Sequence, residues 1–255
     1  HAALALLDST CRFHVRPDIA SASAAVSACE KGSQWQSALS VLSSMPGVRI
    51  VPNVISLNAA ISACEKGAQW QMAFALLKHM PALRLSPDAI SCSAVISACE
   101  RGGPWQLALL LLSSFMPRLR VTPDLISCNA AISACEKCGP WPLALALLSS
   151  LPELRLTPDN VSCSNAISAC EKAGEWRHAL ALLGSMAKLR IPHSVVSCTV
   201  GICACEKAGR WQTVLALLRL MSQLRVWPDA ITCSAAVSAF EAGHRRELAL
   251  SWCSD

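Results

Sequence analysis

Residues 125–141 have the sequence LISCNAAISACEKCGPW, and a nearly identical phrase, VISLNAAISACEKGAQW, occupies residues 54–70. A shorter version, AITCSAAVSAF, covers residues 230–240. Self-similarity at a fixed spacing is the signature of repeat architectures, in which every unit is one small supersecondary element. The fold therefore depends on the length of the repeated unit and on the elements that it contains.

A Pro-Asp or Pro-Asn dipeptide ends most units and fixes the frame of the repeat, whereas the fifth unit ends in His193–Ser194. Five of the six complete units have 35 residues, and the third has one more, near Phe115. We expect a single array over residues 1–255, with a partial unit at 1–18 and a truncated one at 230–255. The complete units are residues 19–53, 54–88, 89–124, 125–159, 160–194 and 195–229.

Each unit has the apolar periodicity of two helices. In the fourth unit, two stripes with the helical spacing i, i+3, i+4 and i+7 are Cys128, Ala131, Ile132 and Cys135, then Trp141, Ala144, Leu145 and Leu148. Asp124 is a good N-cap for the first helix, and Gly139 ends it. Two short helices cannot bury their own apolar faces, so neighbouring units must stack. The expected fold is all-α: a right-handed superhelical α-solenoid of stacked helix-turn-helix repeats of about 35 residues.

Composition narrows the classes of partner. The chain has 255 residues, 53% of them hydrophobic, and its net charge of +5 is mildly basic. That charge is compatible with an anionic partner but does not identify one. The longest apolar run, near Leu107–Leu112, is far shorter than the roughly 18 to 20 residues that span a bilayer. We therefore expect no transmembrane helix and no membrane partner.

Most of the 15 cysteines fall at two positions of the unit, seven residues apart. Seven residues are two helical turns, about 10 Å, which is too long for a disulfide. As small hydrophobic residues, the cysteines fit the buried stripe of the first helix. The single CxxC pair, Cys135 and Cys138, has no second pair at zinc-finger spacing, so we expect no metal site and no cofactor.

A helix pair with this period, ending in Pro-Asp and opening with a phrase such as LISCNAAISACEK, resembles the repeat of the pentatricopeptide repeat (PPR) family. The resemblance covers almost the whole chain. The tetratricopeptide repeat is the rival, but its period is 34 and its signature uses Tyr, which this chain lacks. PPR proteins bind single-stranded RNA, mostly in the mitochondrion or chloroplast, and recognise about one base per repeat. The resemblance therefore implies sequence-specific RNA binding in organellar RNA processing, by editing, splicing, stabilisation or translation.

The chain departs from the family pattern at several positions. Cys replaces the usual Tyr or Phe of the first helix in most units, and Trp replaces the usual apolar residue that opens the second helix. We expect the tryptophans to pack between helices, because they lie on an apolar stripe; base stacking is the alternative. These residues are Trp35, Trp70, Trp105, Trp141, Trp176 and Trp211.

A second stripe of the first helix combines small polar residues with aliphatic ones. It contains positions 2, 5, 9 and 12, counted from the first residue of each unit, and position 13 lies beside it. Position 5 always has a small hydrogen-bonding side chain, although these are mediocre helix formers: Ser23, Asn58, Ser93, Asn129, Ser164, Thr199 and Ser234. Position 2 is aliphatic in six units, where folding alone does not require it: Ile55, Ile90, Ile126, Val161, Val196 and Ile231. The resemblance implies that bases stack between the position-2 side chains, as wedges, while position 5 meets the base edge.

The resemblance implies a second base reader, the last residue of each unit: Asn53, Asp88, Asp124, Asp159, Ser194 and Asp229. Helix capping alone is the alternative, because Asp, Asn and Ser are all preferred N-caps. In the family, Asn with a final Asp is associated with uracil, Thr with Asp with guanine, and Ser with Asn with adenine. Carried over unit by unit, this code predicts the core 5′-AUGUNG-3′. The fifth base, opposite Ser164 and Ser194, is unassigned.

Cations recur at two further positions. Position 13 suits contacts to phosphates, and its residues are Lys31, Lys66, Arg101, Lys137, Lys172 and Lys207. The alternative is a favourable interaction with the dipole of the helix that each cation ends, and the Glu at position 12 partly cancels the charge. A second set precedes the loop to the next unit, and general electrostatics is its only explanation: Arg49, Arg84, Arg120, Arg155, Arg190 and Arg225.

Some family members have a catalytic deaminase or nuclease domain. The deaminase requires H-x-E followed by P-C-x-x-C, and no His of this chain is followed at that spacing by Glu. We therefore expect a non-enzymatic RNA reader, to which protein partners supply catalysis. The alternative is a protein-binding α-solenoid scaffold that does not bind RNA.

Overall fold

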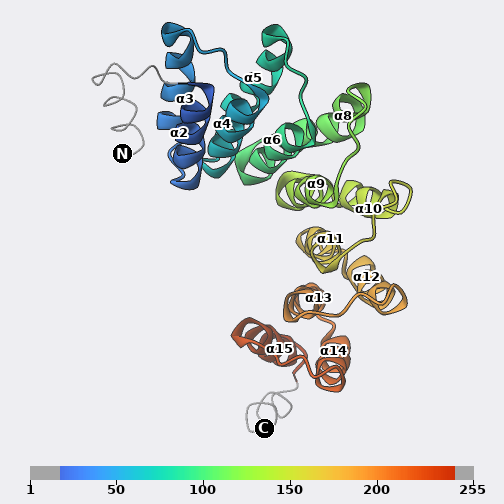
Figure 1. Ribbon diagram of the computed structural model, residues 1–255. Coiled ribbons are helices and arrows are strands. Elements are labelled where there is room, and N and C mark those ends of the chain that lie inside the picture. The colour runs from blue at the N-terminus through green and yellow to red at the C-terminus, as the bar shows by residue number, and fades with distance from the viewer. Residues whose placement is uncertain (1–17, 245–255) are drawn as a thin grey trace. The chain divides into compact units, whose positions relative to one another are not determined.

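The computed structural model describes residues 18–244, and the regular secondary structure of this part consists of helices (Figure 1). The predicted all-α class is confirmed. Residues 1–17 of the expected partial unit and residues 245–255 of the truncated one lie outside the described residues. Within residues 18–244, no helix is both long and apolar enough to cross a bilayer.

One helix starts at the first residue of each expected unit. These first helices are α2 (Ile19–Lys31), α4 (Val54–Lys66), α6 (Ala89–Gly102), α9 (Leu125–Cys138), α11 (Asn160–Lys172), α13 (Val195–Lys207) and α15 (Ala230–Ala242). A second helix starts at each recurring Trp: α3 (Trp35–Ser44), α5 (Trp70–His79), α7 (Trp105–Leu110), α10 (Trp141–Ser150), α12 (Trp176–Lys188) and α14 (Trp211–Gln223).

Hydrogen bonds at the N-cap explain where the first helices begin. Asp88 Oδ1 accepts from the backbone N–H of Ser91 at 2.9 Å, and Ser91 Oγ accepts from the backbone N–H of Asp88 at 2.8 Å. This reciprocal capping box satisfies two N–H groups that have no partner within the helix. The same box, with Asp, Asn or Ser as the cap and Ser three residues later, starts α2, α4, α11 and α13.

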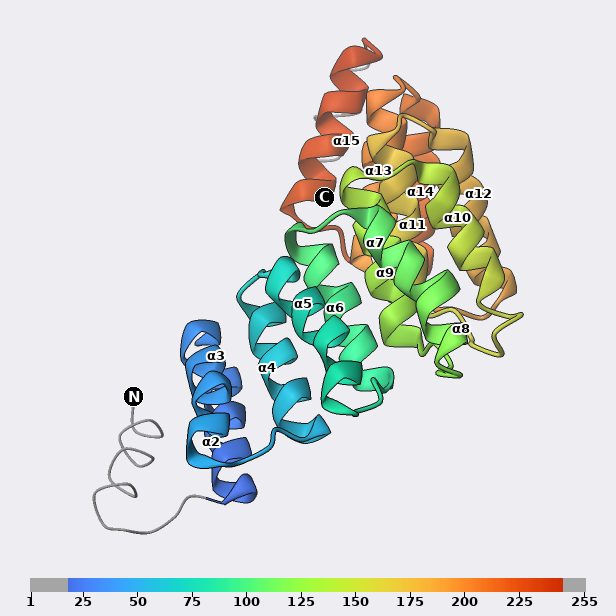
Figure 2. The same cartoon turned by 90° about the horizontal axis from the view of Figure 1, so that it is seen from above.

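Contacts divide the chain after Ala134 into two compact parts. In the first part, α4 packs between α2 and α6, while α3 contacts α4 and α5 contacts α6. In the second part, α13 packs between α11 and α15, while α12 contacts α13 and α14 contacts α15 (Figures 1 and 2). In each part the first helices therefore form one layer, and each second helix packs against the first helix of its own unit and of the next.

The recurring cysteines are core residues. Ten of the twelve cysteines described are buried; Cys64 and Cys99, for example, are 0% and 1% exposed. Burial raises the pKa of each of these two thiols to about 11. Neutral thiols in an apolar layer act as small hydrophobic side chains, as the sequence predicted.

The additional residue of the third unit is accommodated in its second helix. A π-helical segment, Leu111–Phe115, follows α7 and leads into the short helix α8 (Met116–Arg118). One π turn accommodates one additional residue in an α-helix. In the first and second units, a 3₁₀ helix stands in the place of α8: Met45–Val48 follows α3, and Met80–Leu83 follows α5. Met116 is fully buried, as are Met45 and Met80, so the register is restored after the π turn.

The tryptophans pack between consecutive units. Each is partly buried at the start of its second helix. A Cβ atom added to Gly67 of the second unit would overlap the indole ring of Trp35 of the first unit. A Cβ atom added to Gly243 would likewise overlap the indole ring of Trp211. Trp141 also packs against His178 of the next unit, with ring centroids 4.6 Å apart. These contacts agree with the predicted packing role.

The recurring arginines all have a left-handed backbone conformation. Their φ angles lie between 55° and 60°, and all six side chains are exposed. At Arg84, the backbone N–H donates to Pro81 O at 2.9 Å, and the next N–H donates to Met80 O at 3.0 Å. Glycine is the usual residue at such a helix end, because other residues are strained there.

We predict that replacing Gly67 with Ala destabilises the protein by about 1 to 3 kcal/mol, because the new methyl group displaces the Trp35 indole. Gly32→Ala is the matched control: its φ of −82° matches the −83° of Gly67, and its added Cβ has no heavy atom closer than 3.5 Å. Thermal and denaturant unfolding should show a decrease in stability for Gly67→Ala only. Equal effects of the two changes would contradict the indole contact.

We also predict that Arg84→Gly is more stable than Arg84→Ala by about 1 kcal/mol. Both substitutions remove the guanidinium, so the difference isolates the backbone strain at φ +58°. The measurement is the free energy of unfolding in urea. If the two variants unfold alike, the left-handed residue is not strained.

Candidate functional site

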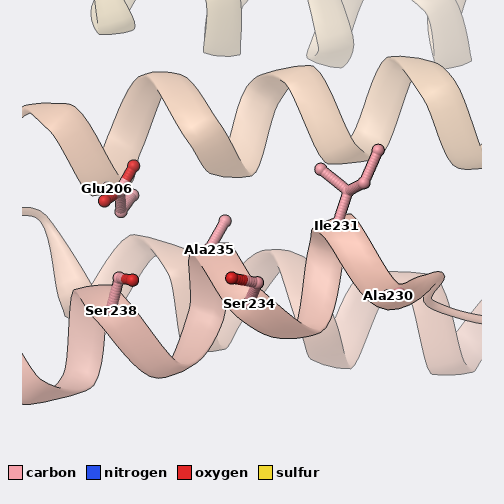
Figure 3. Close-up of a pocket in the computed structure, with 6 residues that line it drawn as sticks. All are labelled: Glu206, Ala230, Ile231, Ser234, Ala235 and Ser238. Atoms are coloured by element: carbon pink, nitrogen blue, oxygen red, sulfur yellow. The ribbon is translucent and has the colours of Figure 1, made fainter.

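Residues at positions 2, 5, 9 and 12, the second stripe of the first helices, line a hollow between two of these helices. In the second part of the chain, Ile231, Ser234 and Ser238 of α15 face Glu206 of α13 across a hollow of about 390 Å³ (Figure 3). These residues occupy positions 2, 5 and 9 of one unit and position 12 of the preceding unit. The structure thus brings together the polar stripe that the sequence analysis singled out.

Position 2 is exposed in every unit where it is aliphatic. Ile55 is 65% exposed and Ile126 is 69% exposed, and the other four residues of the set range from 52% to 64%. An exposed aliphatic side chain is common and by itself means little. Its recurrence at one position of consecutive helices shows that this surface repeats apolar groups at a regular spacing.

Position 5 and the last residue of the unit lie within hydrogen-bond distance in the second unit. Asn58 Nδ2 donates to Asp88 Oδ1 at 3.1 Å and to Asp88 Oδ2 at 2.9 Å. Asp88 caps α6 at the same time. Asn58 Oδ1 is buried and has no hydrogen-bond partner in the described structure. This pair therefore contains one buried acceptor without a partner.

Two other units have related contacts. Ser23 Oγ lies 3.5 Å from Asn53 Oδ1 in the first unit. In the sixth, the hydroxyl groups of Thr199 and Thr232 are 2.6 Å apart, and Thr232 donates to Asp229 at 2.7 Å. The hydroxyl and the backbone N–H of Thr232 hold the pKa of the Asp229 carboxyl below its usual range.

Ser93, Asp124 and Ser234 have other surroundings. Ser93 donates to the backbone of its own helix, to Ala89 O at 2.7 Å. Asp124 accepts from the backbone N–H of Ser127 at 2.8 Å and so caps α9, on which Asn129 is partly buried. Ser234 is exposed in the hollow of Figure 3. Position 5 therefore contacts the last residue of its unit at Asn58, whereas Ser93 contacts its own helix.

The fifth unit contains a residue whose role the sequence analysis missed. Asn160 Oδ1 accepts from Ser164 Oγ at 3.3 Å and from Ser194 Oγ at 3.2 Å. Asp159, the other predicted reader at this helix start, caps α11. The available signal was that Asn160 is the only polar residue at position 1 of any unit.

The cations of position 13 form ion pairs between units. Each of these pairs joins the cation to the Glu at position 12 of the preceding unit, and the cation side chains are 34% to 55% exposed. The pairs are Lys66 with Glu30 at 2.9 Å, Arg101 with Glu65 at 3.5 Å, Lys172 with Glu136 at 2.7 Å, and Lys207 with Glu171.

We call these four ion pairs the charged ladder. In each pair the glutamate side chain is more buried than the side chain of the cation. Glu65 is 19% exposed in its side chain and Glu136 is 14% exposed. Burial raises the pKa of Glu65, and the nearby Arg101 acts against that shift. Ser168 Oγ also donates to Glu136 at 2.9 Å. Glu136 thus fixes the neighbouring unit by both a charged and a neutral donor.

No group of three or more His, Cys, Asp or Glu within residues 18–244 could hold a metal ion. The side chain of Cys138, the second cysteine of the CxxC pair, lies outside the described part of the chain.

Comparisons with known proteins identify the repeat. The model of the PPR repeat matches residues 161–191, in the fifth unit. No curated protein matches the chain. Among solved structures, the PPR protein PPR10 in complex with an 18-nt psaJ RNA element matches with a TM-score of 0.73 and 26% identity, over 97% of this chain and 35% of that one. The chain therefore spans about a third of the length of that protein.

Two further structures have the same fold. PPR10 from maize matches with a TM-score of 0.60 and 20% identity, over 97% of this chain and 40% of that one. The PPR domain of Arabidopsis thaliana protein-only RNase P 1, in complex with tRNA, matches with a TM-score of 0.63 and 11% identity, over 72% of this chain and 97% of that one. Residues 161–191 therefore match the PPR repeat, and the described chain has the fold of PPR proteins of known structure.

Proposed function

We propose that the protein binds single-stranded RNA in a sequence-specific manner, with about one base at each repeat. The similar protein PPR10 has been solved in complex with an RNA element, which supports this class of ligand. In this proposal the aliphatic residues at position 2 stack against bases, and position 5 and the last residue of the unit contact the base edge. The predicted core remains 5′-AUGUNG-3′.

The observation that carries the proposal is the unsatisfied acceptor of the second unit. Both oxygens of Asp88 accept from Asn58 Nδ2, which orients the amide so that Oδ1 has no partner. A buried acceptor without a partner is unfavourable by about 1 to 3 kcal/mol. Uracil offers its ring N–H to this oxygen, and Ile55 and Ile90, both exposed, supply apolar surface for stacking. A ligand that satisfies the acceptor recovers that free energy.

The repeat match and the similarity to PPR10 support the wider parts of the proposal. We infer that residues 1–255 form a single array, that the chain acts without catalysis of its own, and that partner proteins supply any reaction. We also infer a role in RNA processing in the mitochondrion or chloroplast. A protein-binding scaffold is less favoured, because exposed aliphatic side chains recur at position 2 of six consecutive units, as expected of a repeated ligand contact.

The test is Asn58→Thr, measured against 5′-AUGUUG-3′ and 5′-AGGUUG-3′. Wild type should prefer uracil at the second base by about 1 to 3 kcal/mol. The variant should prefer guanine, as expected of Thr with a final Asp, while Asp88 still caps α6 through Ser91. Fluorescence anisotropy titrations give the four Kd values.

Binding of neither RNA by wild type would refute RNA recognition and favour the scaffold. If wild type binds both RNAs equally, the protein is a non-specific binder. The control Asn58→Ala removes the amide without adding a hydroxyl, and should lose the uracil preference without gaining one for guanine.

We propose a phosphate role for position 13 as well. Replacing Lys66, Lys137 and Lys172 with Gln should weaken binding about equally for all RNA sequences. The slope of log K against log salt should become shallower by about 0.7 for each phosphate that a lysine no longer neutralises. The side chains of Lys66 and Lys172 are 34% and 48% exposed, so solvent screens their ion pairs and the melting temperature should decrease only modestly.

The matched control removes the same charge from second helices, through Lys78, Lys188 and Arg219→Gln; all three side chains are exposed. This control should leave the salt slope nearly unchanged. An equal decrease in affinity in the two triple variants would mean that net charge alone, and not position 13, attracts the RNA.

A further inference from the structure

The fifth unit, whose base the family code leaves unassigned, has an arrangement of its own. Position 1 is Asn160, whereas the other units have Ile, Val, Ala or Leu there. Positions 1 and 5 are one helical turn apart on the same side of α11, so Asn160 can reach Ser164. Its Oδ1 accepts from both Ser164 and Ser194, at 3.3 Å and 3.2 Å, and thereby joins the two expected readers of this unit.

The side-chain amide of Asn160 uses its oxygen for contacts within the protein, whereas the amide of Asn58 in the second unit uses its nitrogen. There, Asn58 directs its Nδ2 to Asp88 and leaves its carbonyl oxygen without a partner. In the fifth unit the carbonyl oxygen is occupied by two hydroxyl groups, and no described residue accepts from Asn160 Nδ2. The second unit therefore presents an acceptor, and the fifth unit presents a donor.

Starting the helix does not require Asn160. The N-cap of α11 is Asp159, whose Oδ1 accepts from the backbone N–H of Ser162 at 2.8 Å. The residues at position 1 of the second and sixth units are Val54 and Val195, and the helices there start in the same way. The polar side chain at this position is therefore not explained by folding.

We propose that Asn160 is the base-reading residue of the fifth unit, and that its site takes a keto base, uracil or guanine, in preference to adenine or cytosine. This assignment rests on the proposed RNA binding and extends it to a third reading position. The core then becomes 5′-AUGUKG-3′, where K is uracil or guanine.

The hydrogen-bond pattern sets this preference. Asn160 Nδ2 has donors for a base carbonyl. Ser164 Oγ directs its proton to Asn160, so a lone pair of the same oxygen can accept from a ring N–H. Uracil and guanine carry a carbonyl oxygen beside a ring N–H, which matches this pair. Adenine and cytosine carry an amino group beside a ring nitrogen acceptor, which places donor against donor.

The test uses four RNAs that differ only at the fifth base of 5′-AUGUNG-3′. Wild type should bind the uracil and guanine RNAs about tenfold more tightly than the adenine and cytosine RNAs. Asn160→Val should bind all four alike. Asn160→Asp keeps an oxygen for the two serines but replaces the amide donor with an acceptor, so it should lose the preference for uracil and guanine.

Thermal melting checks that each variant is folded, which is expected because Val is the residue at this position in two other units. A wild type that selects uracil at the second base but not a keto base at the fifth would overturn this assignment and leave the proposed function standing. Keto preference retained in Asn160→Val would also overturn it, because Ser164 and Ser194 would then read the base. A wild type that binds none of the RNAs would overturn both.

Discussion

The side chain that ends each repeat hydrogen-bonds to the first turn of the next helix, and the candidate site depends on this bond. At Asp88 the cap fixes one carboxylate oxygen against the backbone of Ser91. The carboxylate is then held beside Asn58, thirty residues earlier, which contacts both of its oxygens. From the sequence, the two interpretations of these residues were capping alone and capping together with base contact. The structure shows that capping leaves the side chain free for a second contact.

The charged ladder lies at the C-terminal ends of the first helices, whereas the caps lie at their N-terminal ends. Lys66, Arg101, Lys172 and Lys207 each pair with a glutamate of the unit before, so these ion pairs are contacts between stacked units. The glutamates are the more buried partners, and a serine donor reinforces one of them at Glu136. A ligand phosphate that approaches the cations must therefore share them with carboxylates. This arrangement limits the net attraction of the surface for anions of any kind, which favours selectivity over unspecific binding.

Much of the fold could be predicted because it depends on local chemistry. Apolar spacing predicted the helices, and their boundaries follow from caps such as Asp88 and from the tryptophans. The burial of cysteines such as Cys64 followed from their place on the apolar stripe. The partners of polar residues could not be predicted, since they lie about 30 to 36 residues away and depend on how units stack. Ser93, which donates to its own backbone, shows that one residue type at one position can have different partners.

The π turn of the third unit has a consequence for how such arrays tolerate changes in length. The additional residue is accommodated between Leu111 and Phe115, in a second helix, and the following first helix still starts at its capping aspartate, Asp124. The second helices can thus differ in length while the first helices keep their frame. Engineered insertions, such as tags or coupling sites, should for this reason be placed in the second helices. Placed there, they would leave the order of the site residues intact.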